Sequence, residues 1–294
     1  MKKILTLSLV FIMSIFLNAC SKIEQYDQSE NAVIDETPEV VVEENLREKG
    51  SINMEYSSDI STTSKEGEYV LAPSLGMFEP FVKDPSSENV IFYTQTMKTP
   101  QSKESVLTST FDGDYDMPNS LIVPIPAGQV AEKGDVVLTW WQSGSGMILA
   151  KVLEGGETPF VTYLEPDFEI EDANLKANSF VKLTGDFMPG APVIVKDGED
   201  FKYEVMISNS NGDILTQGFA GFIYVREKSN TTVINPYQTY EVGEEIYVPV
   251  INSYDPGVIV SYDEERGSME VEYSWAGSKE TKIFKTNEVT KSLD

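Results

Sequence analysis

Histidine is absent from this sequence of 294 residues, and cysteine occurs only once. A single cysteine excludes a disulfide within the chain. The lack of histidine excludes Ser-His-Asp triads, Cys-His dyads and nearly all zinc sites. Catalysis would have to use carboxylate pairs, Ser-Lys pairs or a hard metal ion held by carboxylates. No Gly-x-Ser-x-Gly motif marks a nucleophile. We therefore expect a protein that is not an enzyme and has no cofactor, with a carboxylate-dependent hydrolase as an alternative.

Basic residues are scarce, with 22 Lys and Arg against 48 Asp and Glu, so the formal net charge is −26. A polyanion of this size repels the phosphates of nucleic acids and anionic lipid headgroups. We therefore expect no nucleic-acid partner, and the charge is better suited to cationic peptides, Ca²⁺ or neutral glycans. Hydrophobic residues make up 40% of the chain, which favours a globular protein over a disordered one.

The amino terminus reads as an export signal. Two lysines precede an apolar run over residues 4–17, which is too short to span a membrane as a helix and has the length of a signal-peptide core. The run ends in Leu-Asn-Ala-Cys at residues 17–20. This sequence resembles the lipobox of bacterial lipoproteins, with leucine at −3, a small residue at −1 and cysteine at +1.

The resemblance to a lipobox implies that residues 1–19 are a signal peptide and that Cys20 becomes the lipidated first residue of the mature chain. Acyl chains such as palmitate would anchor the protein to a membrane of the cell envelope without a spanning helix. Ser21 is not the aspartate that retains some lipoproteins at the inner membrane, so in a cell with two membranes the resemblance implies the outer one. The alternative is an ordinary secretory signal in which the cysteine has no role.

Residues 20–68 are rich in acidic and small polar residues and poor in aromatic ones. Such a composition buries too little apolar surface to offset the entropy of ordering the chain. We expect this stretch to be a flexible acidic tether that holds the folded part away from the lipid surface. An alternative is that Pro38 to Leu46 adds a strand to the sheet of a partner.

A stretch from residue 134 to residue 164 recurs from residue 243 to residue 274. Matching positions lie 109 to 111 residues apart, as in Gly134 with Gly243, Val137 with Ile246, Ile148 with Ile259, Val161 with Val271 and Tyr163 with Tyr273. A nearly constant separation indicates internal duplication. We therefore expect two tandem related units, 69–176 and 177–294, with their clearest similarity in the cores 128–165 and 240–290.

The sequence after residue 68 consists of short Val, Ile, Tyr, Phe and Thr runs broken by Asn-Gly, Asp-Gly, Pro-Gly and Gly-Ser pairs. Examples are NVIFYTQTM, DVVLTWW, FKYEVMIS and MEVEYSW. Such runs are typical of strands joined by tight turns, and no segment has a convincing apolar period of 3.6 residues. We predict an all-β protein in which each unit has upstream strands followed by a small barrel.

The two cores resemble small SH3-like barrels of the Tudor kind. In that family a strand of the pattern Gly-x-x-Val ends near a tryptophan, a glycine-containing loop follows, and two further strands carry an alanine and a Val-x-Tyr sequence. The first core has these features in the same order, at Gly134, Trp140 and Trp141, Gly146, Ala150, Val161 and Tyr163. The second core lacks the tryptophans of the first strand, and neither core has the Asp-Tyr-Gly-Asn loop of the family. The resemblance implies the barrel fold.

Trp140 and Trp141 are the most conspicuous candidates for a binding site. Adjacent residues of a strand point to opposite sides, so at most one ring enters the barrel and the other lies outside it. In a Tudor-like barrel the outward ring would form an aromatic cage with Phe160 and Tyr163, suited to a sugar, a peptide or a cation. The second unit offers two further candidates, Tyr273 and Trp275. The alternative is that the second tryptophan packs against the upstream strands or between the units.

Three carboxylates, Asp112, Asp114 and Asp116, are spaced like the first positions of a calcium loop. The glycine is misplaced for an EF-hand, and Val123 occupies the position of the closing glutamate. A turn with solvated carboxylates is the better interpretation, so we expect no metal site, with these residues as weak Ca²⁺ candidates.

These observations predict a lipid-anchored envelope protein that binds or scaffolds peptides, other envelope proteins or cell-wall glycan. The alternative is a structural or surface lipoprotein without a small ligand.

Overall fold

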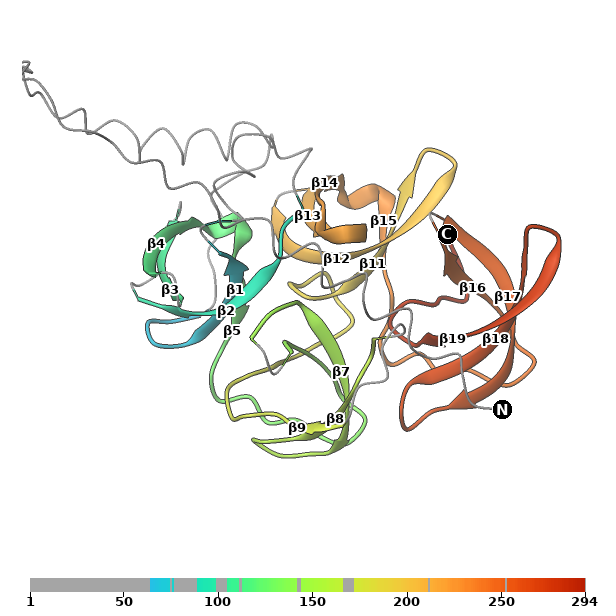
Figure 1. The fold of residues 1–294 in the computed structure, drawn as a ribbon, viewed down its shortest axis with the longest axis horizontal. Coiled ribbons are helices and arrows are strands. Elements are labelled where there is room, and N and C mark those ends of the chain that lie inside the picture. Colours follow the sequence, from blue (N-terminus) through green and yellow to red (C-terminus); the bar gives the residue numbers. More distant parts are fainter. Residues whose placement is uncertain are drawn as a thin grey trace, which may run out of the picture. The chain divides into compact units, whose positions relative to one another are not determined.

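The computed structural model describes residues 64–74, 76, 89–98, 105–110, 113–141, 144–165, 172–210, 212–251 and 253–293 (Figure 1). Nineteen strands and three short 3₁₀ turns are assigned in these ranges, which confirms the predicted all-β class. The described ranges contain no helix with the length and apolar character needed to cross a membrane. The predicted signal peptide, Cys20 and nearly all of the predicted tether lie outside the described residues.

The first sheet contains β1 (Tyr69–Pro73), β2 (Phe92–Met97), β3 (Ser105–Thr110), β4 (Gly113–Pro118) and β5 (Val123–Ile125). Its order is β4-β3-β2-β1-β5, so four consecutive strands form a meander and the fifth returns to pair with the first. The 3₁₀ turn η1 (Asn119–Leu121) reverses the chain before β5. This connection places β1 between two neighbours, and residues 70–73 of β1 are all buried.

The same connection recurs in the second and third sheets. The second sheet has the order β10-β6-β7-β8-β9 and contains β6 (Val136–Thr139), β7 (Ile148–Glu154), β8 (Phe160–Tyr163), β9 (Ala173–Asn174) and β10 (Val181–Lys182). Its last strand therefore lies beyond residue 176, the predicted end of the first unit. The third sheet has the order β14-β13-β12-β11-β15 and contains β11 (Pro192–Asp197), β12 (Asp200–Ser210), β13 (Asp213–Gln217), β14 (Ile223–Glu227) and β15 (Thr231–Val233). Two 3₁₀ turns, η2 (Phe219–Gly221) and η3 (Lys228–Asn230), flank β14.

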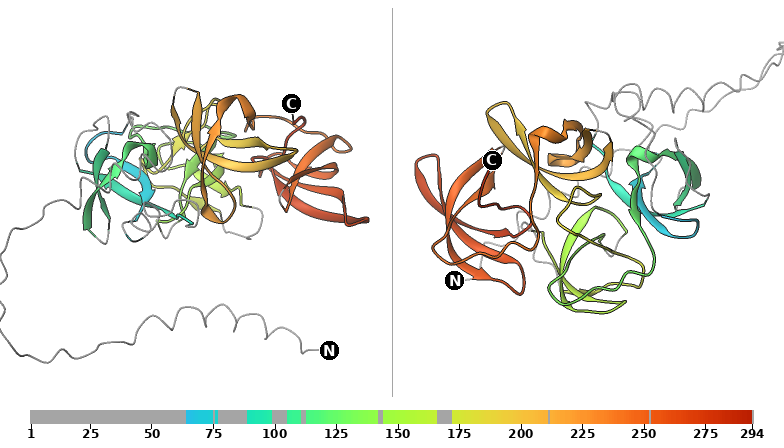
Figure 2. Two further views of the ribbon diagram at one scale, coloured as in Figure 1. Left: turned by 90° about the horizontal axis from the view of Figure 1, so that it is seen from above. Right: turned by 180° about the vertical axis from the view of Figure 1, so that it is seen from behind.

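The fourth sheet has the order β16-β17-β18-β19 and contains β16 (Glu245–Val250), β17 (Ser253–Asp263), β18 (Ser268–Trp275) and β19 (Ser278–Lys285). A single bridge takes the place of the fifth strand. The N–H of Tyr247 donates to the carbonyl of Thr290 at 2.8 Å, and the N–H of Thr290 donates back at 3.1 Å. All four sheets are strongly curled (Figure 2).

The second and fourth sheets begin in the same way. Gly134 and Gly243 adopt φ values of 91° and 88°, and their N–H groups donate to the carbonyls of Val152 and Ile259, each at 2.8 Å. The residue of the first core that matches Ile259 is therefore Val152, and the match with Ile148 was wrong.

The error arose from the length of one hairpin. In the first core Val137 pairs with Ala150, 13 positions later. In the second core Ile246 pairs with Gly257, 11 positions later. The hairpin that follows Trp141 is thus the longer one, whereas the sequence alignment made it the shorter.

One apolar core joins the first three sheets. It includes Leu71 and Phe92 from the first sheet, Leu138 from the second, and Ile207 and Leu215 from the third, all less than 5% exposed. The neighbouring Val137 points to the other side of β6, into a core that belongs to the second sheet. Because both faces of β6 are buried, this strand reads as an uninterrupted apolar run in the sequence.

Candidate binding pocket

The two adjacent tryptophans lie on opposite sides of the chain that leaves β6. Trp140 packs against the core shared by the first three sheets, and its ring meets that of Tyr69 edge-on, with 5.5 Å between centroids. Trp141 packs against the core of the second sheet, with its ring 5.2 Å from that of Tyr163. Each ring is half-buried by these contacts.

The loop that follows closes over Trp141. The N–H of Trp141 donates to the carbonyl of Ser145 at 3.0 Å, and the N–H of Gly144 donates to the carbonyl of Trp141 at 2.7 Å. Gly146 has a φ of 87°, and a Cβ at this position would lie 3.0 Å from Cδ1 of the Trp141 ring. The glycine therefore allows both the turn and the close approach of backbone to ring.

The structure brings Trp141 and Tyr163 together, but Phe160 does not join them. Val161 and Tyr163 both enter the core of the second sheet, whereas Phe160 is three positions from Tyr163 and so points to the other face of β8. Tyr163 is only 5% exposed, its hydroxyl has no hydrogen-bond partner among the described residues, and burial raises its pKa.

The candidates of the second unit lie near the end of β18. The ring of Tyr273 packs edge-on against that of Phe284, with 5.8 Å between centroids. Trp275 is 40% exposed and pairs with Ser278 at the hairpin that leads into β19.

The three predicted calcium ligands are only partly described. Asp112 lies outside the described residues, Asp114 is an exposed residue of β4, and no side-chain contact is described for Asp116. Across the described ranges, no three His, Cys, Asp or Glu side chains form a group that could hold a metal ion. The calcium site stays an untested hypothesis.

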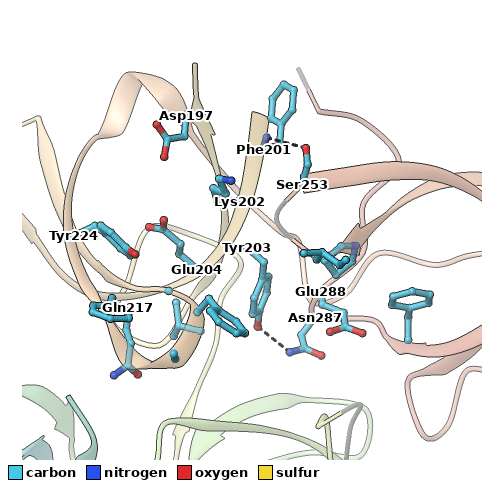
Figure 3. Close-up of a pocket in the computed structure, with 18 of the residues that line it drawn as sticks. Asp197, Phe201, Lys202, Tyr203, Glu204, Gln217, Tyr224, Ser253, Asn287 and Glu288 are labelled. Atoms are coloured by element: carbon cyan, nitrogen blue, oxygen red, sulfur yellow. Dashed lines mark hydrogen bonds between the residues drawn. The ribbon is translucent and has the colours of Figure 1, made fainter. Parts of the chain in front are cut away.

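A pocket of about 710 Å³ lies where the third and fourth sheets meet (Figure 3). Its walls come from β12 and β14, from the end of β13 and the connection 218–222, and from parts of the segment 282–288. Further lining residues are Leu164, Glu165, Asp197, Pro249, Ile251 and Ser253. None of the six aromatic residues predicted to bind a ligand lines this pocket. Because it combines a sizeable volume with charged, amide and aromatic side chains from separate parts of the chain, we take it as the candidate site.

The pocket exists because β13 is shorter than β12. Gln217, the last residue of β13, pairs with Val205, so residues 201–204 of β12 have β11 as their only ladder partner. The strand β17 also packs against β12, and its first residue, Ser253, lies beside Phe201. Both the odd-numbered and the even-numbered side chains of this part of β12 line the pocket. The pocket therefore lies at a short stretch of strand edge without a ladder partner, between the end of β13 at Gln217 and the start of β17 at Ser253.

Hydrogen bonds show which backbone groups of β12 face that edge. The N–H of Met206 donates to the carbonyl of Ala191 at 2.9 Å, on the side of β11. Bonding direction alternates along a strand, so the N–H and C=O of Phe201 and Tyr203 point to the opposite side, toward the pocket. In agreement, the N–H of Phe201 donates to the hydroxyl of Ser253 at 3.4 Å, away from β11.

A buried ion pair forms one wall. Glu204 is 2% exposed, and the guanidinium of Arg226 donates from Nε to both carboxylate oxygens at 3.1 Å and from Nη2 to one of them at 2.5 Å. The hydroxyl of Thr216 donates to the same carboxylate. Burial opposes the charge on Arg226, but the hydrogen bond and charge of Glu204 outweigh it, so the pKa of Arg226 is raised. The guanidinium also stacks on the ring of Tyr224, 4.4 Å from its centroid.

The opposite wall carries a tyrosine and an amide. Asn287 Nδ2 donates to the hydroxyl of Tyr203 at 3.1 Å (Figure 3). Burial, followed by the negative charges of Glu288 and Glu165, raises the pKa of Tyr203. Asn287 is 5% exposed, and its Oδ1 has no partner among the described residues. A buried acceptor of this kind is uncommon in folded proteins, where such groups are nearly always bonded.

Two apolar side chains at the rim of the pocket are turned outward. Phe219 is 83% exposed and Ile251 is 72% exposed. Ile251 has a φ of 54°, and Ala220, next to Phe219, has a φ of 55°. Left-handed backbone is strained for side chains with a Cβ, most of all for a β-branched residue, and such strain clusters at functional sites.

No known protein family matches the chain, and no curated protein matches it with significant similarity. The functional argument therefore depends on the pocket itself. The sequence did not predict this site, because its residues are far apart in the chain and meet only where separate sheets pack together. The one available signal was Phe219, which lies in a Gly-Phe-Ala-Gly-Phe stretch where glycines flank an aromatic residue.

Proposed function

We propose that this chain is a lipid-anchored envelope protein whose β-sheet body binds or scaffolds a peptide, another envelope protein or cell-wall glycan. The observation that carries the binding part of this proposal is the pocket of about 710 Å³ beside β12. Ligand pockets have volumes of roughly 300 to 1,000 Å³ and combine apolar walls with a few polar groups. The volume of the pocket beside β12 lies in this range, and its lining is more polar than usual, with seven charged side chains among aromatic and aliphatic ones.

The lipid anchor and the binding role of the β-sheet body are supported by separate observations. The lipobox-like residues 17–20 and the acidic stretch 20–68 favour a lipid anchor with a spacer. In the first three sheets the fifth strand returns to pair with the first, and in the first and third sheets a 3₁₀ turn precedes it. Small SH3-like barrels have the same strand order. Barrels of this kind commonly serve as binding modules.

The chemistry of the pocket favours binding over catalysis. A carboxylate-dependent hydrolase needs a carboxylic acid that is free to transfer a proton. The most buried carboxylate of the pocket, Glu204, is held by Arg226 and Thr216 instead. The pair forms a wall that fixes Tyr224 in place.

The anchor is tested by metabolic labelling with an alkyne analogue of palmitate. We expect label on the wild-type chain and on a Ser21→Ala control, and none on Cys20→Ser, which should leave the membrane fraction. Equal labelling of Cys20→Ser and the wild type would refute the anchor.

The binding role is tested by titrating the purified full-length chain with two ligand sets, a panel of short peptides and soluble peptidoglycan fragments. We expect saturable binding to at least one set. Saturable binding to neither set, together with a large self-association interface, would instead support a structural lipoprotein.

A further inference from the structure

The open edge of β12 offers a place for one more strand. Tyr203 turns a backbone N–H and C=O toward the pocket, and β13 stops at Gln217 before it can pair with them. Phe201 uses its N–H on Ser253, which leaves Tyr203 as the central residue of the edge. In an antiparallel ladder the residue opposite such a position exchanges two hydrogen bonds with it.

A segment of polypeptide in extended conformation matches this edge. It supplies a donor and an acceptor at the spacing of the ladder, and its alternate side chains enter pockets on the two sides. A glycan offers hydroxyl groups but no such repeat of N–H and C=O. The exposed rim residues Phe219 and Ile251 would in addition contact the apolar side chains of a peptide.

The charge of the pocket favours basic residues at the peptide positions that do not contact Phe219 and Ile251. Four carboxylates and three cations line the pocket, so the lining carries an excess of one negative charge. Arg226 is paired with both Glu204 and Asp197. Glu165 and Glu288 line the same pocket as Tyr203 and Asn287, and the buried acceptor Oδ1 of Asn287 has no partner among the described residues. The whole chain carries a net charge of −26, which attracts cations over longer distances.

We propose that the pocket takes an extended peptide with alternating basic and apolar side chains, which pairs with the edge of β12 at Tyr203 and covers Phe219 and Ile251. This inference rests on the binding function proposed above and names its ligand class. The peptide pairs with the third sheet at Tyr203 alone, between the end of β13 at Gln217 and the start of β17 at Ser253.

The test uses fluorescence anisotropy with the full-length chain and a fluorescein-labelled peptide of alternating lysine and valine. We expect saturable binding. A peptide of the same sequence with alternate backbone amides N-methylated should bind about tenfold more weakly, because the N–H that would donate to the carbonyl of Tyr203 is lost and the methyl group obstructs the approach of the two backbones, while charge and side chains stay the same. A glutamate-valine peptide should bind more weakly still.

Two rim variants test the location. Phe219→Ser should weaken binding about tenfold, because the contact of one large apolar side chain is lost. Ile251→Gly removes an apolar side chain and relieves the left-handed backbone, so it should fold normally and still bind several-fold more weakly. Val130→Ser is the control: Val130 is 58% exposed and does not line the pocket, and its variant should bind like the wild type.

Three results would overturn the inference. Equal binding of the N-methylated peptide would show that a polyanion attracts a cation without strand pairing. Unchanged binding in both rim variants would place the peptide elsewhere on the chain. Peptidoglycan fragments that bind at the Phe219 rim in place of the peptide would make the ligand a glycan. Each of these leaves a binding protein, whereas the proposed function itself fails only if no ligand of either set saturates.

Discussion

The loop around Trp141 and the edge of β12 are both rich in aromatic residues, but they differ in what covers them. At Trp141 the chain folds back, and the turn through Gly146 packs against the ring. At β12 the neighbouring strand ends early, and Tyr203, Phe219 and Tyr224 border an open pocket. The comparison shows that a conspicuous aromatic pair in a sequence indicates packing as readily as binding, and that strand lengths decide which aromatic residues stay accessible.

The largest expected effect concerns the wall of the pocket. Arg226→Ala leaves the carboxylate of Glu204 buried and without its cation, so the free energy of unfolding should fall by about 3 kcal/mol or more. Arg266→Ala is the matched control, because Arg266 forms a half-exposed pair with Asp172 and should contribute less than about 1 kcal/mol. Urea denaturation of both variants measures the difference. Equal losses would mean that the pocket wall is no better ordered than the surface.

A smaller effect is expected at the loop that covers Trp141. Gly146→Ala places a Cβ at a φ of 87° and 3.0 Å from the Trp141 ring, so it should destabilise the fold by about 1 to 2 kcal/mol and shift the tryptophan emission. Gly128→Ala, at a φ of 79° with open space around it, carries only the backbone strain. If the two variants lost the same stability and had the same emission, the loop would not hold the ring.

The smallest effect appears at alkaline pH, where buried tyrosines resist ionisation. The folded-state pKa values of Tyr163 and Tyr203 are raised above the unfolded value of about 10, so their contribution to stability is complete below that pH and is lost as the pH rises beyond it. The slope is at most about 1.4 kcal/mol per pH unit for each tyrosine. Tyr203→Phe should flatten the decline more than Tyr163→Phe, because carboxylates add to burial at Tyr203. Urea titrations across this pH range measure both slopes, and an unchanged slope in Tyr203→Phe would contradict the prediction.

Much of the fold could be predicted from local patterns. The stretch 136–139 forms β6, as its composition indicated, and Gly134 and Gly243, which were matched as repeat positions, both adopt a positive φ before the first strand of their sheet. The residue-by-residue pairing of the strands was harder to predict from the sequence. The pairing of Val137 with Ala150 depends on the length of one hairpin, and an alignment without coordinates placed the gap on the wrong side of that hairpin. The strand β10 was also missed as part of the second sheet, because it comes from beyond the predicted boundary.

The candidate site could not be predicted from these local patterns. Trp140 and Trp141 stood out as a pair of large aromatic residues, and in the structure both contribute to packing. The pocket residues Tyr203, Arg226 and Asn287 lie far apart in the chain and have no motif in common. Their proximity depends on which sheet packs against which, and that is set by long-range contacts.

The sequence by itself determined the all-β class, the positions of the tight turns and the excess of negative charge, because alternation, glycine and composition act over a few residues at a time. It also supplies the lipobox-like ending at Cys20, on which the proposed anchor depends. Only the tertiary structure decided that the first three sheets share a core, that the tryptophans are packed and that β12 keeps an open edge beside Asn287. The edge of β12 arises because β13 is shorter than β12, and the shared core and the packed tryptophans depend on contacts between residues far apart in the chain. No local pattern in the sequence records either.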